Sequence, residues 1–479
     1  MTRSDTAATT QLGRPARPGI DVGARATFTN TIRLRLRVPA KLRNLELVLL
    51  IFGIVIVVFA IGLVQLGALG TLFPHMLELG GALGVLVIAL HIVLRFAAPQ
   101  ADPFIVPVAF VLNGIGIAEI YRIDIAKKFT GWEGAGARQI AWTGMAIVLA
   151  MAVILIIRNH RVLQRYRYVA MFVGIVLLLL PMLPGIGQTV NGARLWIHIG
   201  GFQFQPGELA KIALAVFFAG YLVSARDSLS MVGRKILGIR FPRARDLGPI
   251  LVIWAASMSV LIFQHDLGTA LLYFGLFLVM IYVATGRISW VILGLGLFVG
   301  GAVAAGQSLS YVHARFAAWL DAFNPQIYGA PGGSYQLVQG LFGLAHGGLV
   351  GTGLGQGRPT IVPLAESDYI IASLGEELGL VGLFAILALY LVFVSRGFRI
   401  GFAGQDDFGR LLGVGLAFTI ALQTFIVIGG VTRVIPLTGL TTPFLAAGGS
   451  SLVANWIIAA LLLRLSDSVR TQSTLVVQT

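Results

Sequence analysis

The stretch NGARLWIHIGGFQFQPGELAK, from Asn191 to Lys211, lies between two long apolar runs of a chain in which only 11% of the residues are charged. Pro206 suits the first turn of a helix, where its missing N–H group costs nothing. Glu208 and Lys211 then lie three residues apart on one face of that helix and can pair. Because a charge inside a membrane span is costly and rarely kept without a role, the pair is either a structural tie or part of a polar cavity open to the outer leaflet.

The composition around this stretch is that of a membrane protein. Hydrophobic residues make up 57% of the 479 residues, and the mean hydropathy is +0.87. A soluble globular protein has roughly 25% charged residues, more than twice the share found here. The absence of cysteine from the sequence excludes disulfides, thiolate metal ligands and cysteine nucleophiles. The net charge of +15 lies mostly in short loops between apolar runs, which indicates membrane topology and not a nucleic-acid partner.

Twelve apolar runs have the length, about 17–25 residues, that a membrane-spanning helix needs. They fall near residues 45–68, 77–97, 103–121, 138–157, 167–185, 207–224, 247–264, 267–284, 288–306, 368–395, 410–430 and 442–464. The sequence therefore predicts an all-α polytopic membrane protein of about twelve transmembrane helices. Basic loops after the fourth, sixth and tenth runs then share one face with the N-terminal end, so the positive-inside rule places both termini in the cytoplasm.

The first 43 residues form a polar, basic leader that precedes the first apolar run. The leader is too long, and the run after it too apolar, for a cleavable signal peptide. We therefore expect residues 1–43 to be a cytoplasmic tail that is mostly disordered. Residues 466–479 form a second, short cytoplasmic tail.

Three segments are predicted on the outer face: 186–206, 307–367 and 431–441. The second is rich in glycine and proline and lacks hydrophobic periodicity, so at that length it should be either functional or disordered. Its GTGLGQG sequence is not a nucleotide site, since no strand precedes it and no Walker lysine follows it. Small residues there suit close backbone packing or an extended substrate surface.

Several carboxylates fall in or beside these outer segments. Asp266 is either a functional carboxylate or only the N-cap of the next helix. Glu376 and Glu377 come about two turns into a span, which indicates a function or a structural partner such as Arg433. Polar groups therefore crowd the outer half of the predicted membrane domain.

Five motifs occur in a fixed order along the chain: NGARLWIHIGGFQFQPGELAK, QHDLGTALL, GLVGTGLGQG, ESDYIIASLGEELGLVG and TGLTTPFLAAGGSSLVANW. Together they resemble the SEDS family (shape, elongation, division and sporulation), the peptidoglycan polymerases of the RodA and FtsW type. The resemblance covers about 103–465 and implies a ten-helix core with a large outer loop at 307–367. Residues 44–102 would add two N-terminal helices, as in actinobacterial members. AAGGSS, where many members carry SYGGSS, favours a RodA-like elongation protein over an FtsW-like division protein.

The resemblance implies an enzyme of the bacterial cytoplasmic membrane that polymerises lipid II at the outer face. In this reaction the 4-hydroxyl of the acceptor's GlcNAc attacks the anomeric carbon of the donor's MurNAc with inversion, and undecaprenyl pyrophosphate leaves. Such a reaction needs a carboxylate base. It also needs positive charge at the pyrophosphate, from side chains or from a divalent cation such as Mg²⁺ or Mn²⁺ whose ligands the sequence leaves unknown. The implied partner is a class B penicillin-binding protein.

The position of the base departs from the family pattern. Members carry an essential aspartate between an N-P or D-P turn and G-Y-Q, whereas here QIYGAPGG joins Asn324-Pro325 to Ser334-Tyr335-Gln336 without an acid. Asp321 is therefore the first candidate for the base and Asp368 the alternative, unless the usual base is absent.

The other site residues also follow from the resemblance. Glu208 and Lys211 match the Q-P-x-E-L-A-K pair that lines the family's central polar cavity. Arg194, Arg315 and Arg433 are expected to contact the pyrophosphate or the sugars, with plain surface charges as the alternative. The remaining expected cavity residues are Trp196, Gln205, Asp266, Tyr335, Gln336 and Glu376.

Two other functions are compatible with the sequence. A lipid II flippase would need polar groups along a path through the membrane, whereas the inner halves of the predicted helices are nearly bare of them. A scaffold without activity would be supported if Asp321→Asn left glycan synthesis intact.

Overall fold

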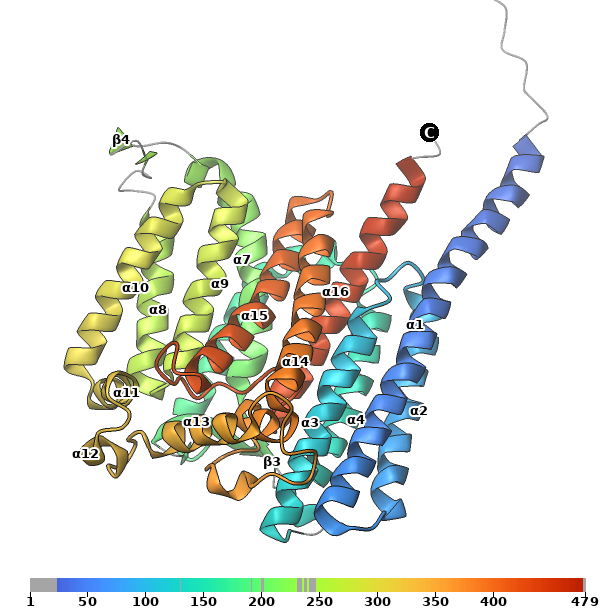
Figure 1. The fold of residues 1–479 in the computed structure, drawn as a ribbon. Helices are drawn as coiled ribbons and strands as arrows, with labels where there is room; N and C mark the ends of the chain where they lie inside the picture. Colours follow the sequence, from blue (N-terminus) through green and yellow to red (C-terminus); the bar gives the residue numbers. More distant parts are fainter. Residues whose placement is uncertain are drawn as a thin grey trace, which may run out of the picture.

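The computed structural model describes residues 24–476, apart from 130, 191, 200–201, 231–234, 237–238 and 241–246. Each of the twelve predicted apolar runs coincides with a helix, and the helices lie side by side in one layered bundle (Figure 1). They are α1 (Ala24–Leu69), α2 (Pro74–Ala97), α3 (Ile105–Lys127), α4 (Ala135–Ile156), α6 (Arg167–Leu179), α7 (Pro206–Ser230), α8 (Gly248–Gln264), α9 (Leu267–Thr285), α10 (Ile288–Ser308), α14 (Ile370–Phe402), α15 (Asp407–Val431) and α16 (Gly449–Val476). Within the described residues, ten helices are long and apolar enough to cross a membrane, while α6 and α8 are apolar but shorter.

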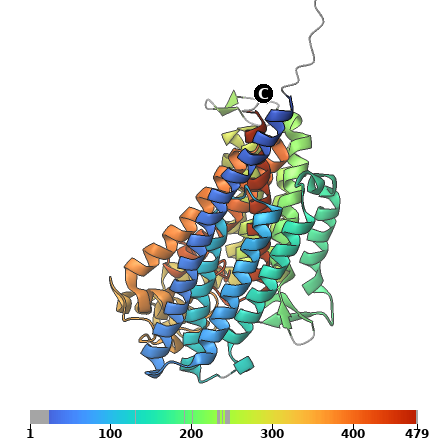
Figure 2. The ribbon, with the colours of Figure 1, turned by 90° about the vertical axis from the view of Figure 1, so that its right-hand side faces the viewer.

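Both described ends of the chain lie at the same end of the bundle (Figure 1). An even number of crossings produces this arrangement. Helix α1 begins at Ala24, inside the segment expected to be a tail, and α16 continues to Val476. The first 23 residues of the expected tail lie outside the described residues. Figure 1 places α1 and α2 at one edge of the bundle, and Figure 2, which views that edge, shows them in front of the other helices.

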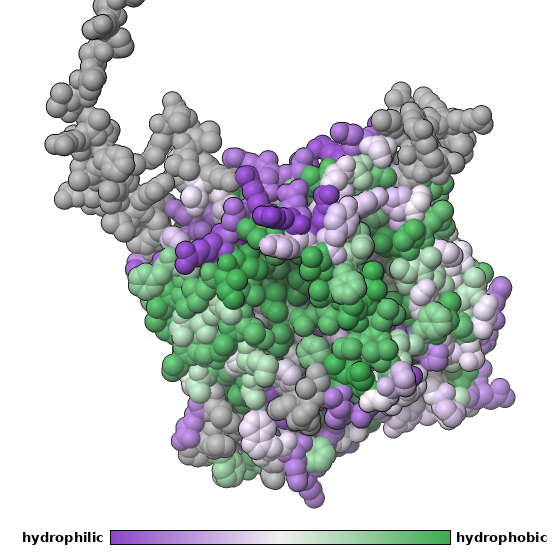
Figure 3. Space-filling view, turned by 180° about the vertical axis from the view of Figure 1, so that it is seen from behind, coloured by the Kyte–Doolittle hydropathy of each residue, from purple (hydrophilic) through white to green (hydrophobic). Residues whose placement is uncertain are grey.

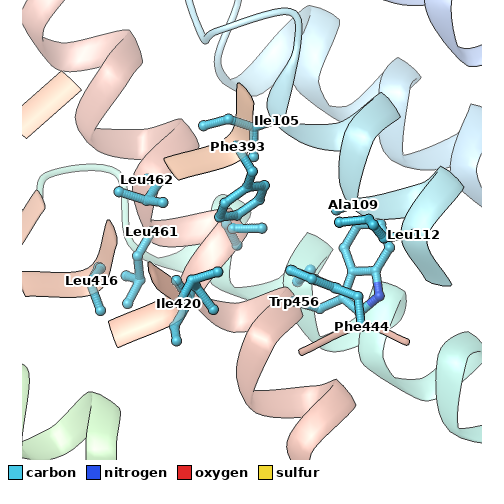
Figure 4. Packing of buried hydrophobic residues seen from close by; sticks show 14 of the residues in the cluster. Ile105, Ala109, Leu112, Phe393, Leu416, Ile420, Phe444, Trp456, Leu461 and Leu462 are labelled. Carbon is cyan, nitrogen blue, oxygen red and sulfur yellow. The ribbon is translucent and has the colours of Figure 1, made fainter. Parts of the chain in front are cut away.

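The surface and the core fit a membrane environment. Figure 3 shows a hydrophobic band across one face, with hydrophilic residues toward the two ends, which is the pattern that lipid tails and headgroups require. Inside the bundle, Phe444 packs edge-on against Trp456 with 6.0 Å between ring centroids (Figure 4). The indole N–H of Trp456 donates to Asn113 Oδ1 at 3.3 Å, so this buried donor is satisfied.

The 186–206 segment is a small sheet and not only a loop. Its strands β1 (Gly187–Val190), β2 (Ala193–Ile199) and β3 (Phe202–Phe204) pair antiparallel in the order β1-β2-β3. Two more short strands, β4 (Lys235–Ile236) and β5 (Ile239–Arg240), pair antiparallel in the connection from α7 to α8. Short helical turns at η1 (Gly131–Glu133), α5 (Arg161–Arg165) and η2 (Leu180–Met182) complete the connections before α7.

The long segment 307–367 is folded, so of the two alternatives, functional or disordered, the disordered one was wrong. It contains α11 (Ser310–Leu320), α12 (Pro325–Tyr328), α13 (Tyr335–Gly347) and η4 (Pro359–Ile361). These elements lie at the end of the bundle opposite to the chain ends (Figure 1). The helices are short and gain their stability from tertiary packing, α13 chiefly against α14.

Candidate functional site

The three predicted outer segments meet at one end of the bundle. One hydrogen bond joins two of the segments, from Trp319 Nε1 to the Arg433 carbonyl (3.1 Å). Two more join a segment to the connection before a neighbouring helix: from His265 Nδ1 to the Gly192 carbonyl (3.0 Å) and from the Ala447 N–H to the Glu366 carbonyl (2.8 Å). The fold therefore brings residues that are far apart in the sequence to a single polar surface.

The ion pair predicted in α7 is present, and its two groups are in direct contact. Lys211 Nζ lies 2.6 Å from Glu208 Oε2. The ammonium group also donates to Gln423 Oε1 at 2.9 Å and to Asn455 Oδ1 at 3.0 Å, so its three hydrogens all have acceptors. Only 1% of the Lys211 side chain is exposed. The pair thus ties α7 to α15 and α16, and its place in the wall of a substrate cavity stays a prediction.

Asp266 is the N-cap of α9, one of the two alternatives that the sequence left open. Its carboxylate accepts a hydrogen bond from the Thr269 N–H at 2.8 Å and another from the Thr269 hydroxyl. The neighbouring His265 lies against the ring of Tyr311, with 4.5 Å between centroids. This contact fixes the start of α11 beside Asp266.

Asp368 and Arg315 are a second pair of opposite charges on this surface, near enough for the charge of Arg315 to act on the Asp368 carboxyl. Asp368 is half-buried in the turn before α14, and burial raises the pKa of its carboxyl to about 6. The charge of Arg315 and a hydrogen bond from Ser367 lower this pKa, while the carboxylates of Asp266 and Glu366 raise it. At neutral pH the group is therefore mainly ionised and able to accept a proton.

Arg315 is the positively charged member of this pair. It lies in α11 and makes no hydrogen bond to any residue that the structure describes. Gly439, in the 431–441 segment, adjoins Asp368, because a Cβ there would lie 3.8 Å from Asp368 Oδ2. A guanidinium without a hydrogen-bond partner among the described residues, near an ionisable carboxylate, is suited to bind an anion, while the carboxylate can take up a proton.

Asp321, the first candidate for the base, has a different environment. It is exposed at the C-terminal end of α11, where it accepts a hydrogen bond from Asn324 Nδ2 at 3.0 Å. Arg433 holds the same helix end, with Nε 2.7 Å from the Trp319 carbonyl and Nη2 2.7 Å from the Leu320 carbonyl. The guanidinium of Arg433 thus satisfies helix carbonyls, which leaves fewer donors for the pyrophosphate contact expected of it.

Glu377 has a structural partner, but Arg433 was the wrong prediction for it. Glu377 Oε1 accepts from Arg122 Nε at 3.0 Å and from the Gly357 N–H at 3.1 Å, and its Oε2 accepts from the Gly355 N–H at 2.7 Å. The GTGLGQG segment therefore does wrap an anion, namely a carboxylate of the same chain. Gly355 has a φ of 86°, a conformation that favours glycine.

Arg122 was missed in the sequence because it directly follows the predicted run 103–121, whereas the structure places it inside α3, where an arginine is itself a signal. The arginine lies in α3 and also donates from Nη2 to the Gly357 carbonyl at 2.7 Å. The adjacent Glu376 accepts from His346 Nδ1 at 2.9 Å and from the Arg358 N–H at 3.1 Å. The carboxylates of the two neighbouring glutamates thus hold the glycine-rich segment and α13 against α14.

The remaining expected residues surround this surface without joining a single cluster. Arg194 lies on strand β2 and donates from Nη2 to the Leu183 carbonyl at 3.2 Å. Trp196 pairs with Gln188 across the sheet, and the Gln205 N–H donates to Ser450 Oγ at 3.1 Å. The ring centroid of Tyr335 lies 5.3 Å from that of Tyr328. Gln336 Nε2 donates to the Pro363 carbonyl at 2.9 Å. Among the described residues, no three histidine, aspartate or glutamate side chains group as a metal site.

Known proteins resemble this chain over most of its length. A family model described as a cell cycle protein, of the FtsW, RodA and SpoVE type, matches residues 103–471. The peptidoglycan glycosyltransferase RodA of Mycobacterium tuberculosis is 44% identical over 432 residues, which cover 89% of this chain and 91% of the relative. A probable peptidoglycan glycosyltransferase FtsW of a Geobacter species is 32% identical over 382 residues, which cover 77% and 97%.

Two solved structures share the fold. A chain from a study of the structural coordination of polymerization and crosslinking by a peptidoglycan synthase complex has a TM-score of 0.59 at 24% identity, over 77% of this chain and 98% of its own. The crystal structure of the Thermus thermophilus rod shape determining protein RodA has a TM-score of 0.53 at 24% identity, over 76% and 96%. Helices α1 and α2 precede the residues that the family model matches.

Proposed function

The chain belongs to the FtsW/RodA/SpoVE family and is a peptidoglycan glycosyltransferase of the RodA type, and from this premise we propose that it polymerises lipid II at the end of the bundle formed by α11 to α13. The basic loops lie toward the opposite end, so the positive-inside rule makes that end cytoplasmic and the site extracytoplasmic. Lipid II carries its sugars and pyrophosphate outside the hydrocarbon layer, at the level of this surface.

The observation that carries the proposal is the pair formed by Asp368 and Arg315. In our assignment, the Asp368 carboxylate accepts the proton of the acceptor's 4-hydroxyl as the oxygen attacks the anomeric carbon of the donor. One glycosidic C–O bond forms, the bond from that carbon to the pyrophosphate oxygen breaks, and the pyrophosphate leaves with the electron pair. Arg315 stabilises the negative charge that develops on the leaving group, because its donors have no other hydrogen-bond acceptor among the described residues.

Asp368 fits this role better than Asp321 does. A general base works best when its pKa lies near the working pH, and burial raises the pKa of Asp368 to about 6. Asp321 instead is exposed, and its carboxylate already accepts a hydrogen bond from Asn324. A Mg²⁺ or Mn²⁺ ion at the pyrophosphate stays a prediction, which the addition of EDTA to the assay tests.

The experiment supplies the purified chain with labelled lipid II, with and without a class B penicillin-binding protein. We expect glycan chains from the parent and from Asp321→Asn, and none from Asp368→Asn. The reverse result for the two aspartates would transfer the role of the base to Asp321. Movement of lipid II across vesicle membranes without chain growth would support a flippase instead.

The proposed partner is a class B penicillin-binding protein. One structure with this fold comes from a peptidoglycan synthase complex that coordinates polymerization and crosslinking. A chain that only polymerises needs a crosslinking partner to make a mesh. We expect addition of the partner to raise the polymerisation rate in the same assay, and an unchanged rate would contradict a stimulating role.

A further inference from the structure

A basic hollow lies at the end of the bundle that carries the chain ends. It has a volume of about 410 Å³ and is lined by Arg161, Gln164, Arg165, Arg167 and Tyr168, from α5 and the start of α6. The sequence contains no acidic residue between Glu133 and Glu208, so no carboxylate from this part of the chain neutralises the hollow.

The three arginines of the hollow differ in their partners. Arg167 is fixed by hydrogen bonds from Nη1 to the Gly220 carbonyl, at 2.9 Å, and to the Ser224 hydroxyl. Arg165 makes no ion pair with any residue in the described part of the chain. Arg161 lies 3.8 Å from Asp406, but that carboxylate is 2.9 Å from His160.

A second carboxylate at this end of the bundle, Asp407, has its own arginine partners. Asp407 is 3.0 Å from Arg226 Nη1 and 2.7 Å from Arg410 Nη2. Arg165 thus has no carboxylate partner among the described residues and Arg167 is held by hydrogen bonds, so the hollow is suited to the oxygens of a phosphate group.

The residues around the hollow place it at the membrane surface. Val162, Tyr166, Val169 and Phe172 are all largely exposed, with Phe172 at 66%. Exposed aliphatic and aromatic side chains beside arginines are typical of the headgroup level, where tyrosine rings are enriched. A ligand in the hollow would therefore have both a phosphate and an apolar part that lies along α6.

We propose that this hollow binds the headgroup phosphate of an anionic phospholipid. Arg161 and Arg165 supply the charge, Arg167 is held in place by α7, and the acyl chains lie over Val169 and Phe172. Basic residues at the ends of membrane helices attract the headgroups of anionic lipids. This site is distinct from the glycosyl-transfer surface, which lies at the other end of the bundle (Figure 1).

The test uses the delipidated full-length protein in detergent, titrated with phosphatidylglycerol and followed by native mass spectrometry. The parent should bind it, and Arg165→Gln should bind about fivefold more weakly, since one arginine near an anionic surface contributes about this much. Arg399→Gln is the matched control, because Arg399 is an exposed arginine of the same end and lies outside the hollow. It should bind as the parent does.

Three outcomes would overturn the proposal. One is equal binding by Arg165→Gln and the parent, with both folded as judged by thermal unfolding. Another is equal binding of phosphatidylcholine and phosphatidylglycerol, which would show that the headgroup charge is not recognised. The third is displacement of the lipid by inorganic phosphate at low millimolar concentration, which would make the hollow a site for a soluble anion.

Discussion

The pairs Lys211–Glu208 and Arg315–Asp368 each combine a basic and an acidic side chain, but the first pair is buried and the second is partly exposed. Lys211 donates to three acceptors and is almost fully enclosed between α7, α15 and α16. Arg315 lies near Asp368 at the surface between the outer segments, and its guanidinium makes no hydrogen bond to a described residue. The first pair has completed its interactions inside the protein, and the second has not.

This difference separates what holds the bundle from what can act on a substrate. A buried pair with complete hydrogen bonds resists any change, because loss of one partner leaves an uncompensated charge. An incomplete pair can exchange water for ligand oxygens without breaking a contact within the protein, so its interactions can strengthen as the reaction proceeds. Catalysis is therefore expected at Arg315 and Asp368, and stability at Lys211 and Glu208.

The largest expected effect is that of Asp368→Asn. The substitution keeps the shape of the side chain but removes the proton acceptor, which should lower the polymerisation rate by about 10²–10⁴-fold. The rate is measured with labelled lipid II, and thermal unfolding serves as the check of the fold. If the variant retains more than a tenth of the parent rate, Asp368 is not the base, and the contrast between the two pairs does not separate catalysis from stability.

The second prediction concerns Lys211→Met. The change leaves Glu208 buried without a counter-charge and should lower the free energy of unfolding by about 3–5 kcal/mol. The measurement is thermal or denaturant unfolding in detergent. The double variant Glu208→Gln/Lys211→Met carries no buried charge at this place and should regain most of that stability. If the stable double variant polymerises no lipid II, the pair also acts on substrate, as the sequence motif predicts.

The contrast between the pairs could not be found in the sequence, although their helices could. Long apolar runs predict spans because lipid leaves a backbone few alternatives to a helix, and the twelve runs coincide with twelve helices. The acceptors of Lys211 lie 212 and 244 residues further along the chain, and Arg122 lies 255 residues from Glu377. No local pattern encodes such pairings, so the wrong partner was predicted for Glu377.

The short helices of the outer segment were missed for a related reason. Helix α11 has eleven residues and α13 has thirteen, lengths at which an isolated helix is marginal in water. Arg433 completes the end of α11 from a segment more than a hundred residues away. Their order thus depends on tertiary contacts, and the glycine-rich composition alone indicated a loop.

A smaller effect is expected from Arg315→Gln. Loss of a charged hydrogen-bond donor to the leaving pyrophosphate should lower the polymerisation rate by about 10–100-fold. Arg315→Lys keeps the charge and should retain more of the rate than the glutamine variant does. Equal rates for Arg315→Gln and the parent would show that the open pair does not contact the leaving group, and would leave Asp368 without its proposed partner.

The smallest effect is a pH dependence that should distinguish catalysis from stability at the same carboxyl group. Since Asp368 has a pKa of about 6, the rate should fall to about half of its plateau near pH 6 and about tenfold by pH 5. The stability that this group contributes changes in the opposite sense: its pKa is raised on folding, so the contribution is complete below about pH 4 and is lost as the pH rises through 6. Arg315 lowers this pKa, so Arg315→Gln should move the midpoint of the rate profile above 6. A midpoint that Arg315→Gln leaves unchanged would assign the titration to another group, whereas a raised midpoint would link the open pair directly to proton transfer.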